Sequence, residues 1–594
     1  MDEAHIRRLV GAVKGGRVSR RAFIQRLVAA GVSAPIAAQI LMHSGVAQAQ
    51  MPAPYTPTKR GGGGRLTILY WQGPTLLNPH FATGVKDADA SRIFYEPLAS
   101  WDDDGNLYPV LAAQLPSRED GSISADGMSV IWKLKPGVTW HDGQPVTSDD
   151  LVFTWEYARD PATSAITVST YKDVTVEKID GLTIKVKFAK PTPFWASAFV
   201  GGGVLPKHHF AAYSGDKSRD APANLKPVGT GPYKIVEFKP GDMLRGEINT
   251  AYHIPNMPHF DTLEIKGGGD APSAARSVLQ TGEFDFGWNM LVEDEILLRM
   301  EQGGKGRVIF TSAGSIEHVG VNSTDPNTEV DGEKSSLKTK HPAFQDKAVR
   351  KALRLLVDRD GVEKFIFGRT GRATPNFVNK PERFRSKTTS YEFNVDKANA
   401  ILDAAGWVRG TDGIRAKGGT KLKWVFQTSI NGPRQKAQAI IKQACQKAGI
   451  DVELKAIVAA VYFSTDVANP DTLAKFNADI QMYAITMGQP DSETFLRLFR
   501  SDQMPTKANK WQGRNTNRYV NPEFDATHTA AESELDPIKR AALLIKCNDM
   551  VVEDGCVIPI VYRPGVHAVA NKLKTSVSGW DSTLAGLNNW YRET

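Results

Sequence analysis

The sequence predicts a mixed α/β protein with at least two lobes. Its 594 residues are too many for a single hydrophobic core. Residues 65–188 contain several short strand patterns, whereas the second half of the chain mainly shows helical spacing of apolar residues. Between residues 422 and 456 a strand pattern, a helix pattern and a second strand pattern follow one another. That order predicts a βαβ unit and therefore a sheet with parallel strands.

Residues 1–49 have the composition of an export signal. Arg20 and Arg21 precede an apolar stretch at 27–42, and the small-x-small pattern of residues 47–49 is the kind that signal peptidase cuts. The order indicates a signal peptide of the twin-arginine type. The apolar stretch is shorter than a membrane-spanning helix requires, so no permanent anchor is expected. We therefore expect a periplasmic protein of a Gram-negative cell.

The first part of the exported chain is predicted to be a lead-in followed by strands. Residues 50–64 contain three prolines and four glycines, which predict a flexible lead-in. The first strand is expected at 65–71. Further strands are expected at 129–134, 174–179 and 182–188. Asp180-Gly181 joins the last two and is a strong hairpin signal.

Helices are predicted to dominate the second half. Apolar residues recur at helical spacing within 342–367 and again within 396–405, where Gly406 ends the pattern.

The predicted βαβ unit has a clear start and end for each element. A strand at 422–426 leads into a helix opened by Asn431 and Pro433, and Gly449 ends that helix before a return strand at 450–456. This unit is the best-defined part of the predicted second lobe.

Charge excludes a nucleic-acid partner. The formal net charge is +8, but the predicted leader carries seven basic and two acidic residues, so the remainder is near +3. No basic stripe interleaved with aromatic residues is present.

Three cysteines leave two interpretations open. An oxidising compartment would permit a disulfide between Cys547 and Cys556, and an odd count leaves one thiol free. Alternatively Cys445, Cys547 and Cys556 are small buried hydrophobic side chains.

Catalytic and metal-binding motifs are missing from the sequence. It has no Gly-x-Ser-x-Gly nucleophile elbow, no phosphate-binding glycine loop, no Cys-x-x-Cys and no His-Glu-x-x-His. His208 and His209 are adjacent, so on a helix or strand their side chains are expected to point apart and to chelate poorly. His141 beside Asp142 is better interpreted as a turn residue bonded to backbone than as a general base. We expect no enzyme activity, no catalytic residue, no cofactor and no metal.

Four segments resemble one protein family and occur in that family's order. They are residues 132–153, including Trp140-His141-Asp142-Gly143; residues 229–235, beginning Gly229-Thr230-Gly231-Pro232-Tyr233; residues 344–360, including Val349-Arg350-Lys351-Ala352-Leu353; and residues 396–407, ending Ala405-Gly406-Trp407. The family is the family 5 extracellular solute-binding proteins, the large peptide-type receptors of ABC importers. The resemblance extends from about residue 64 to the C-terminus.

This resemblance implies an α/β, two-lobed periplasmic-binding-protein clamshell with an extra domain in the first lobe. Lobe I would combine residues 65–105, 225–310 and 560–594, with the extra domain at 106–224 and lobe II at 312–558. The hinge would lie near 312–321 and 559–563. Such a receptor captures a small solute by lobe closure and delivers it to permease subunits in the inner membrane, and we expect it to act as a monomer.

The resemblance also nominates ligand-binding residues by position. They are Thr83, Gly84, Lys86 and Asp89 after the first strand, Trp288 and Asn289 in lobe I, and Tyr483, Ile485, Gly488 and Asp491 in lobe II. For Trp288, ordinary core packing is an equally open interpretation.

One position departs from the family's pattern. Peptide receptors of this family often have an aspartate in the turn that precedes the proline-aspartate pair, where it binds the free amine of the ligand. Aligned on Pro490-Asp491, that position is Gly488 here. A buried ammonium without a counter-charge is costly, and Asp491 is either its replacement or a turn cap. A di- or oligopeptide is the leading ligand by family frequency. An opine, a glycoside or a metal chelate remains open, as do an exported enzyme and a chaperone-like or sensory receptor.

Overall fold

The computed structural model describes residues 9, 12, 13, 18, 20–29, 58–82, 84–464, 468–511 and 513–593. Within the predicted leader it describes mainly the helix α2 (Arg20–Ala29), and the predicted cleavage site at 47–49 lies outside the described residues. Thr83 lies outside them as well. Among the helices of the described residues, none has both the length and the apolar character needed to cross a membrane.

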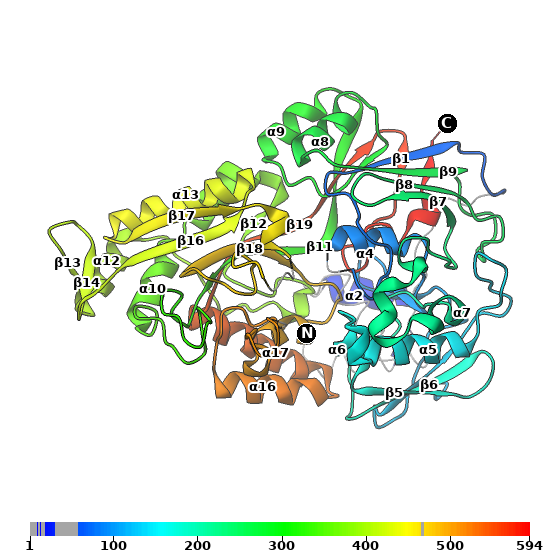
Figure 1. Cartoon of the computed structure of the whole chain (residues 1–594), viewed down its shortest axis with the longest axis horizontal. Coiled ribbons are helices and arrows are strands. Elements are labelled where there is room, and N and C mark those ends of the chain that lie inside the picture. Colours follow the sequence, from blue (N-terminus) through cyan, green and yellow to red (C-terminus); the bar gives the residue numbers. More distant parts are fainter. Residues whose placement is uncertain are drawn as a thin grey trace.

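An eleven-stranded mixed sheet runs through both lobes (Figure 1). Its order is β17 (Asp451–Ile457), β16 (Lys423–Ser429), β18 (Ile480–Thr486), β11 (Gly306–Val321), β19 (Val557–Ala570), β10 (Phe286–Gly287), β1 (Arg65–Tyr70), β9 (Thr262–Gly267), β8 (Met243–Ile248) and β7 (Tyr233–Lys239), and β12 (Arg372–Ala373) pairs with β19. The long antiparallel strands β11 and β19 pass from one lobe to the other. They therefore connect the two lobes directly.

The first lobe is built around β1. Leu66, Ile68 and Tyr70 are fully buried, and β1 runs parallel to both β9 and β10. Three helices belong to this lobe: α4 (Val85–Arg92), α8 (Ala271–Leu279) and α9 (Asp294–Glu301). Near the C-terminus, Trp590 packs on Phe286 with ring centroids 4.8 Å apart. The end of the chain thus returns to the core in which β1 begins.

The predicted hairpin at 174–188 is confirmed. β5 (Val174–Lys178) and β6 (Thr183–Phe188) pair antiparallel, and β4 (Ser129–Lys133) completes a separate sheet in the order β4-β6-β5. Beside this sheet lie β2 (Ala99–Trp101), β3 (Leu107–Pro109), α5 (Ser148–Arg159), α6 (Val168–Tyr171) and α7 (Lys207–Phe210). Thr147 begins α5, and its N–H donates to Asp150 at 2.9 Å in a capping box.

His141 binds the backbone of the Gly-Thr-Gly segment, as its interpretation as a turn residue predicts. Its Nε2 lies 3.0 Å from the carbonyl oxygen of Gly231, and its Nδ1 accepts from the N–H of Gly229 at 3.2 Å. Burial lowers the pKa of His141 to about 4, so the ring is neutral near pH 7. A Cβ at Gly229 would lie 1.9 Å from the carbonyl oxygen of Phe94, which explains the glycine. These motif residues are therefore structural.

The second lobe contains the predicted βαβ unit. β16 and β17 are parallel and α13 (Gly432–Lys447) joins them, with Asn431 accepting from the N–H of Arg434 at 3.2 Å. Gly449 follows the helix with φ +76°. Both the cap and the stop signal are confirmed.

The helical pattern at 342–367 is divided in the structure. α10 (Lys347–Leu355) ends before Asp358, which accepts from the N–H of Gly361 at 2.8 Å and begins α11 (Arg359–Val362); a π-helical turn follows at 363–367.

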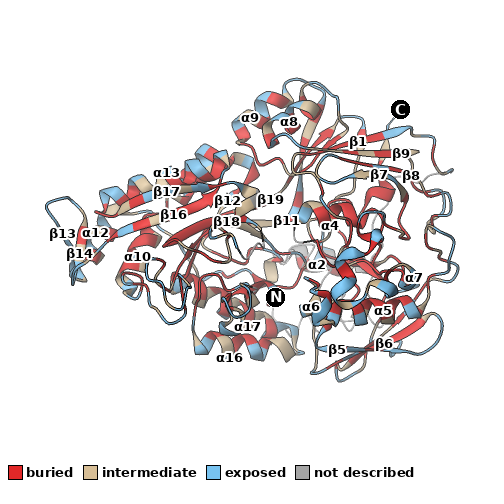
Figure 2. Ribbon diagram, viewed as in Figure 1, coloured by how far each residue is buried: buried red, intermediate tan, exposed pale blue. Residues whose placement is uncertain are grey.

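The other helices are α12 (Val395–Ala404), α14 (Ala459–Tyr462), α15 (Glu493–Leu496), α16 (Pro522–Ser533) and α17 (Pro537–Glu553). The short strands are β13 (Val408–Arg409), β14 (Arg415–Lys417), β15 (Thr420–Lys421), β20 (Leu573–Lys574) and β21 (Tyr591–Arg592). Figure 2 shows buried residues along the central strands and the inner faces of the helices.

The glycines at 61–64 are hydrogen-bonded to the connection between β8 and β9. The N–H groups of Gly62 and Gly64 donate to the Asp261 carboxylate at 2.8 and 2.9 Å, and Gly61 N–H donates to the carbonyl of Pro258 at 2.9 Å. This part of the predicted flexible lead-in is therefore held in place.

The three cysteines are free and buried. Cys556 Sγ lies 3.3 Å from the carbonyl oxygen of Val551, and burial raises the pKa of the Cys547 thiol to about 12. Of the two interpretations left open by the sequence, the structure supports small buried side chains and shows no bond between Cys547 and Cys556.

Candidate ligand-binding site

A small cavity lies where the two lobes meet at the long strands. Its lining comes from β11, β19, the segments after β12 and β18, α15 and the C-terminal segment: Gly314, Ile316, Phe377, Val378, Asn379, Lys380, Met487, Phe495, Tyr562 and Trp580. The cavity volume is about 10 Å³. A water molecule needs roughly that much, so in this conformation the walls are closed on each other.

Four of the ten residues that line the cavity are aromatic: Phe377, Phe495, Tyr562 and Trp580. Phe377 stacks on Phe495 with centroids 4.8 Å apart and meets Phe499 edge-on at 4.9 Å. Lys380, two residues beyond Val378, is exposed and brings an ammonium group to the rim. If the walls separate, this lining can contact an apolar group of a ligand, and Lys380 can pair with an anionic group.

A glycine lies where β11 and β19 pass beside this cavity. Pairing of β11 with β19 shifts register between Phe310 and Gly314. A Cβ at Gly314 would lie 1.8 Å from the carbonyl oxygen of Arg563, so only glycine permits this approach. Next to it, the N–H of Ser312 donates to the Asp103 carboxylate at 2.9 Å. The bulge is thus closely packed on both sides.

A buried charged cluster stands where β11 and β19 enter the second lobe. The Glu317 carboxylate accepts from Arg434 at 3.0 and 3.1 Å, and Arg563 Nε lies 3.3 Å away. Burial alone would raise the pKa of Glu317, but the two guanidinium groups outweigh it and lower that pKa. With two arginines and one carboxylate, the cluster has a surplus positive charge.

The nominated residues of the second lobe lie on β18 and in the turn after it. Tyr483 and Ile485 are half-buried, and the Tyr483 ring meets His318 edge-on at 4.4 Å. Gly488 is exposed, and a Cβ there would meet nothing within 4 Å.

Asp491 is buried and bound to an arginine. Its Oδ1 accepts from Arg540 Nη2 at 2.9 Å, Arg540 Nη1 donates to its Oδ2, and the N–H of Glu493 donates to Oδ1 at 3.0 Å. Burial would raise the pKa of Asp491, but the charge of Arg540 outweighs burial and lowers it. Its negative charge is therefore already paired, and it also caps the turn.

The nominated aspartate of the first lobe is buried as well. Asp89 accepts from Trp288 Nε1 at 2.8 Å, Tyr70 O–H at 3.1 Å, Ser582 O–H at 2.7 Å and Thr583 N–H at 2.8 Å. Trp288 stacks on Tyr70 with centroids 4.7 Å apart, so its indole belongs to the core of the lobe.

The remaining nominated residues of this lobe have local roles. Gly84 begins α4, and Lys86 Nζ lies 2.9 Å from the Asp87 carboxylate and 2.8 Å from Thr75 Oγ1. Asn289 has φ +52°, and its carbonyl accepts from Trp71 Nε1 at 2.9 Å.

The structure joins Asp89 directly to Trp288 and places the lobe II nominees on one strand and turn. None of the nominated residues is among those that line the cavity. Met487 lies beside Gly488 and could have been found from that segment. Phe377 and Trp580 come from segments without a recognisable motif, so only the folded chain brings them together.

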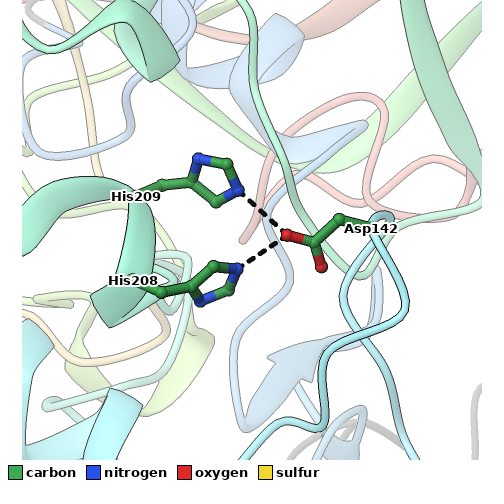
Figure 3. A group of neighbouring side chains, drawn as sticks. All are labelled: Asp142, His208 and His209. Atoms are coloured by element: carbon green, nitrogen blue, oxygen red, sulfur yellow. Dashed lines mark hydrogen bonds and ion pairs between the residues drawn. The ribbon is translucent and has the colours of Figure 1, made fainter.

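His208 and His209 converge instead of pointing apart, so that prediction is wrong. Their Nε2 atoms lie 2.7 and 3.0 Å from the same oxygen of Asp142 (Figure 3). The two residues occupy the short helix α7. Side chains of consecutive helical residues diverge, and the Asp142 oxygen lies between the two directions where both rings can reach it.

Comparisons with known proteins agree with this architecture. The family model for bacterial extracellular solute-binding proteins, family 5 Middle, matches residues 106–506. Oligopeptide-binding protein AppA of Bacillus subtilis (strain 168) is 28% identical over 406 residues, which cover 66% of this chain and 69% of AppA. The structure of B. subtilis AppA in complex with a nonapeptide has a TM-score of 0.75 at 24% identity and covers 91% of this chain and all (100%) of AppA.

Two solved structures with other ligands have the same fold. NikZ from Campylobacter jejuni in complex with Ni(L-His) has a TM-score of 0.73 at 22% identity, covering 89% of this chain and 99% of NikZ. MoaA from A. tumefaciens R10 in complex with mannopinic acid has a TM-score of 0.71 at 21% identity, covering 90% of this chain and 100% of MoaA.

Two lobes joined by a pair of long strands, with a cavity at their junction, define a two-lobed binding protein. The chain belongs to the bacterial extracellular solute-binding proteins of family 5.

Proposed function

We propose that this protein captures a di- or oligopeptide and delivers it, chemically unchanged, to the permease subunits of an ABC importer in the inner membrane. The observation that carries the proposal is the family match over residues 106–506, supported by the similarity to the oligopeptide-binding protein AppA. A receptor of this kind uses binding energy to favour the closed state, which the permease distinguishes from the open state.

β11 and β19 act as the hinge in this proposal. Lobe I comprises 65–105, 225–310 and 560–594, with an extra domain at 106–224, and lobe II comprises 312–558. Contacts across the junction support closure. Lys436 pairs with Glu293 at 2.7 Å, Arg369 pairs with Asp294 at 2.6 Å, and Lys190 pairs with Glu532.

Location and assembly belong to the same proposal. The pattern at 1–49 favours export by a twin-arginine signal and release into the periplasm, where the mature chain acts as a monomer.

A non-peptide solute is the second candidate, and two observations favour it. Gly488 provides no carboxylate, and the charge of Asp491 is already paired with Arg540. A ligand ammonium therefore lacks its counter-charge in this turn. An opine or a metal chelate needs none there, and the ligands in the MoaA and NikZ structures are of these kinds.

Native mass spectrometry of the protein purified from its own periplasm tests both candidates. Co-purified peptide masses are the expected result, whereas an opine, glycoside or chelate mass would select the second candidate. Incubation with the recovered ligand should leave its mass unchanged, because a receptor performs no chemistry; a converted product would replace both candidates with an exported enzyme. Adding the recovered ligand should raise the melting temperature.

A further inference from the structure

Three metal-ligating side chains converge on the surface, outside the cavity between the lobes. Asp142 lies in the loop after β4, and His208 and His209 lie on α7. Their ligating atoms all lie within 4.8 Å of one another. Figure 1 places α7 at the far side of the first lobe from β16, β17 and β18. The group is therefore separate from the candidate ligand-binding site.

We propose that Asp142, His208 and His209 bind one divalent transition-metal ion, with Zn²⁺ as the best-matched ion. Two imidazole nitrogens and one carboxylate oxygen form a ligand set that Zn²⁺ accepts, with water in the remaining positions. The three side chains are partly exposed, at 38%, 36% and 31% for His208, His209 and Asp142, so an ion and its waters can enter. The site is independent of the proposed transport function.

Two of the three ligand-to-ligand distances are close to those that a bound ion requires, and the third, between the two histidine nitrogens, is within 4.8 Å. Ligands about 2.1 Å from one ion at angles of 90–109° lie about 3.0–3.4 Å apart. The two Nε2–Oδ2 distances are 2.7 and 3.0 Å, so the ion would enter when these atoms separate by a few tenths of an ångström and each imidazole carries its proton on Nδ1, which leaves Nε2 free to ligate.

Both segments are held in place by other contacts. Lys207 N–H donates to Asp150 at 2.9 Å, and Phe210 is fully buried, which fixes α7 at both ends. On the other side, Gln144 N–H donates to the second oxygen of Asp142 at 3.1 Å. A site whose ligands are already oriented loses little entropy when the ion binds.

The structure has a second group of three possible metal ligands, and its surroundings explain why we propose the metal site at Asp142, His208 and His209 instead. Glu493, His528 and Glu532 also place three ligand atoms together. There Arg497 lies 2.8 Å from Glu493, and Lys190 pairs with Glu532, so cationic side chains already occupy the carboxylates. Asp142, by contrast, has no lysine or arginine within ion-pair distance in the described part of the chain.

Calorimetric titration of the untagged, EDTA-treated full chain with ZnCl₂ tests the proposal. We expect one saturable site per chain. Loss of a group that only orients a metal ligand costs about 10- to 100-fold in affinity, so the double variant His208→Gln/His209→Gln should lose at least about 100-fold. Asp142→Asn should also weaken binding. His259→Gln, which changes a partly buried histidine in the β8–β9 connection, is the matched control and should bind as the unsubstituted protein does.

Cobalt spectra test the ligand set without any substitution. Co²⁺ bound by two imidazoles and a carboxylate should show visible absorption distinct from aqueous Co²⁺, and Zn²⁺ should displace it. Absence of a saturable zinc site, an unaltered zinc affinity in the folded double variant, or a spectrum of aqueous cobalt only would each overturn the proposal.

Discussion

Asp89 in the first lobe and Asp491 in the second are both buried aspartates at positions nominated for ligand binding, but their partners differ. Asp89 accepts from one indole, two hydroxyls and one backbone N–H, with no cation among these four donors. Asp491 accepts two hydrogen bonds from the guanidinium of Arg540. One carboxylate is held by neutral dipoles and the other by a full positive charge.

At both positions the carboxylate is bound by groups of the protein itself and has a structural role. Both carboxylates have their acceptor capacity used by the protein itself, so neither is free for a ligand in this conformation. Their pKa values respond in opposite directions, because desolvation raises that of Asp89 while the charge of Arg540 overcomes desolvation and lowers that of Asp491.

The largest expected effect comes from removing the cation. Arg540→Met leaves Asp491 buried without its partner, and breaking a buried pair costs about 3–5 kcal/mol. Chemical denaturation should show this loss in the free energy of unfolding. The double variant Arg540→Met/Asp491→Leu removes both charges and should recover most of it. A single variant as stable as the unsubstituted protein would show that the pair contributes little.

A smaller loss is expected from the neutral cluster. Asp89→Asn keeps the shape but replaces one acceptor oxygen with an amide N–H₂. The two donors bound to that oxygen, which are Trp288 and Tyr70 on Oδ2 or Ser582 and Thr583 on Oδ1, then lose their acceptor. Unsatisfied buried groups cost about 1–3 kcal/mol. Denaturation monitored by tryptophan fluorescence measures this, and Val85→Ala, at an exposed position of the same helix, is the control for a general effect on α4. A loss of stability larger than that of Arg540→Met would contradict the expectation that the neutral cluster around Asp89 contributes less than the Asp491–Arg540 pair.

The stability contributions of the two aspartates should change with pH in opposite directions. Asp491, with a lowered pKa, contributes stability above the ordinary value of 3.8, and this is lost as the pH falls through its folded pKa. Asp89, with a raised pKa, binds its proton more tightly in the folded state, so stability is lost as the pH rises from 3.8 through its folded pKa.

Unfolding free energies measured from pH 2 to 7 check these signs. The advantage of the unsubstituted protein over Asp491→Asn should grow as the pH rises, and that over Asp89→Asn should shrink. Slopes of the same sign would contradict the comparison.

The smallest effect concerns the turn beside Asp491. A side chain at Gly488 meets open space, and Gly488 is not among the residues with positive φ, so Gly488→Asp should change stability by no more than about 0.5 kcal/mol. If the cargo is a peptide, the added carboxylate should tighten binding of a tripeptide by about tenfold through its free amine.

The N-acetylated tripeptide is the control ligand and should show no gain, because it has no ammonium group. Calorimetry with both ligands gives the ratio. An equal gain for both would mean that the new carboxylate does not reach the amine.

Several secondary-structure elements were predicted correctly because the interactions that begin and end them involve neighbouring residues in the sequence. Asn431 caps α13 and Gly449 ends it through hydrogen bonds and backbone angles set by neighbouring residues. The Asp180-Gly181 hairpin is of the same kind. The continuous helical pattern at 342–367 failed, since Asp358 starts a new helix within it.

The residues of the candidate site come from segments far apart in the chain, so they could not be predicted from local sequence. Phe377, Met487 and Trp580 meet only after the lobes assemble, and Asp89 meets Ser582 and Thr583 across almost 500 residues of chain. Spacing along the chain carries no information about such partners.

The family was predicted from the resemblance of four motif segments, whereas the α/β alternation and the helix ends were predicted from backbone propensities and apolar periodicity, which act over a few residues. Only the folded chain shows that the protein's own donors occupy Asp89 and Asp491. It also decided that His208 and His209 share Asp142, because the position of a partner from another segment depends on the packing of the whole molecule.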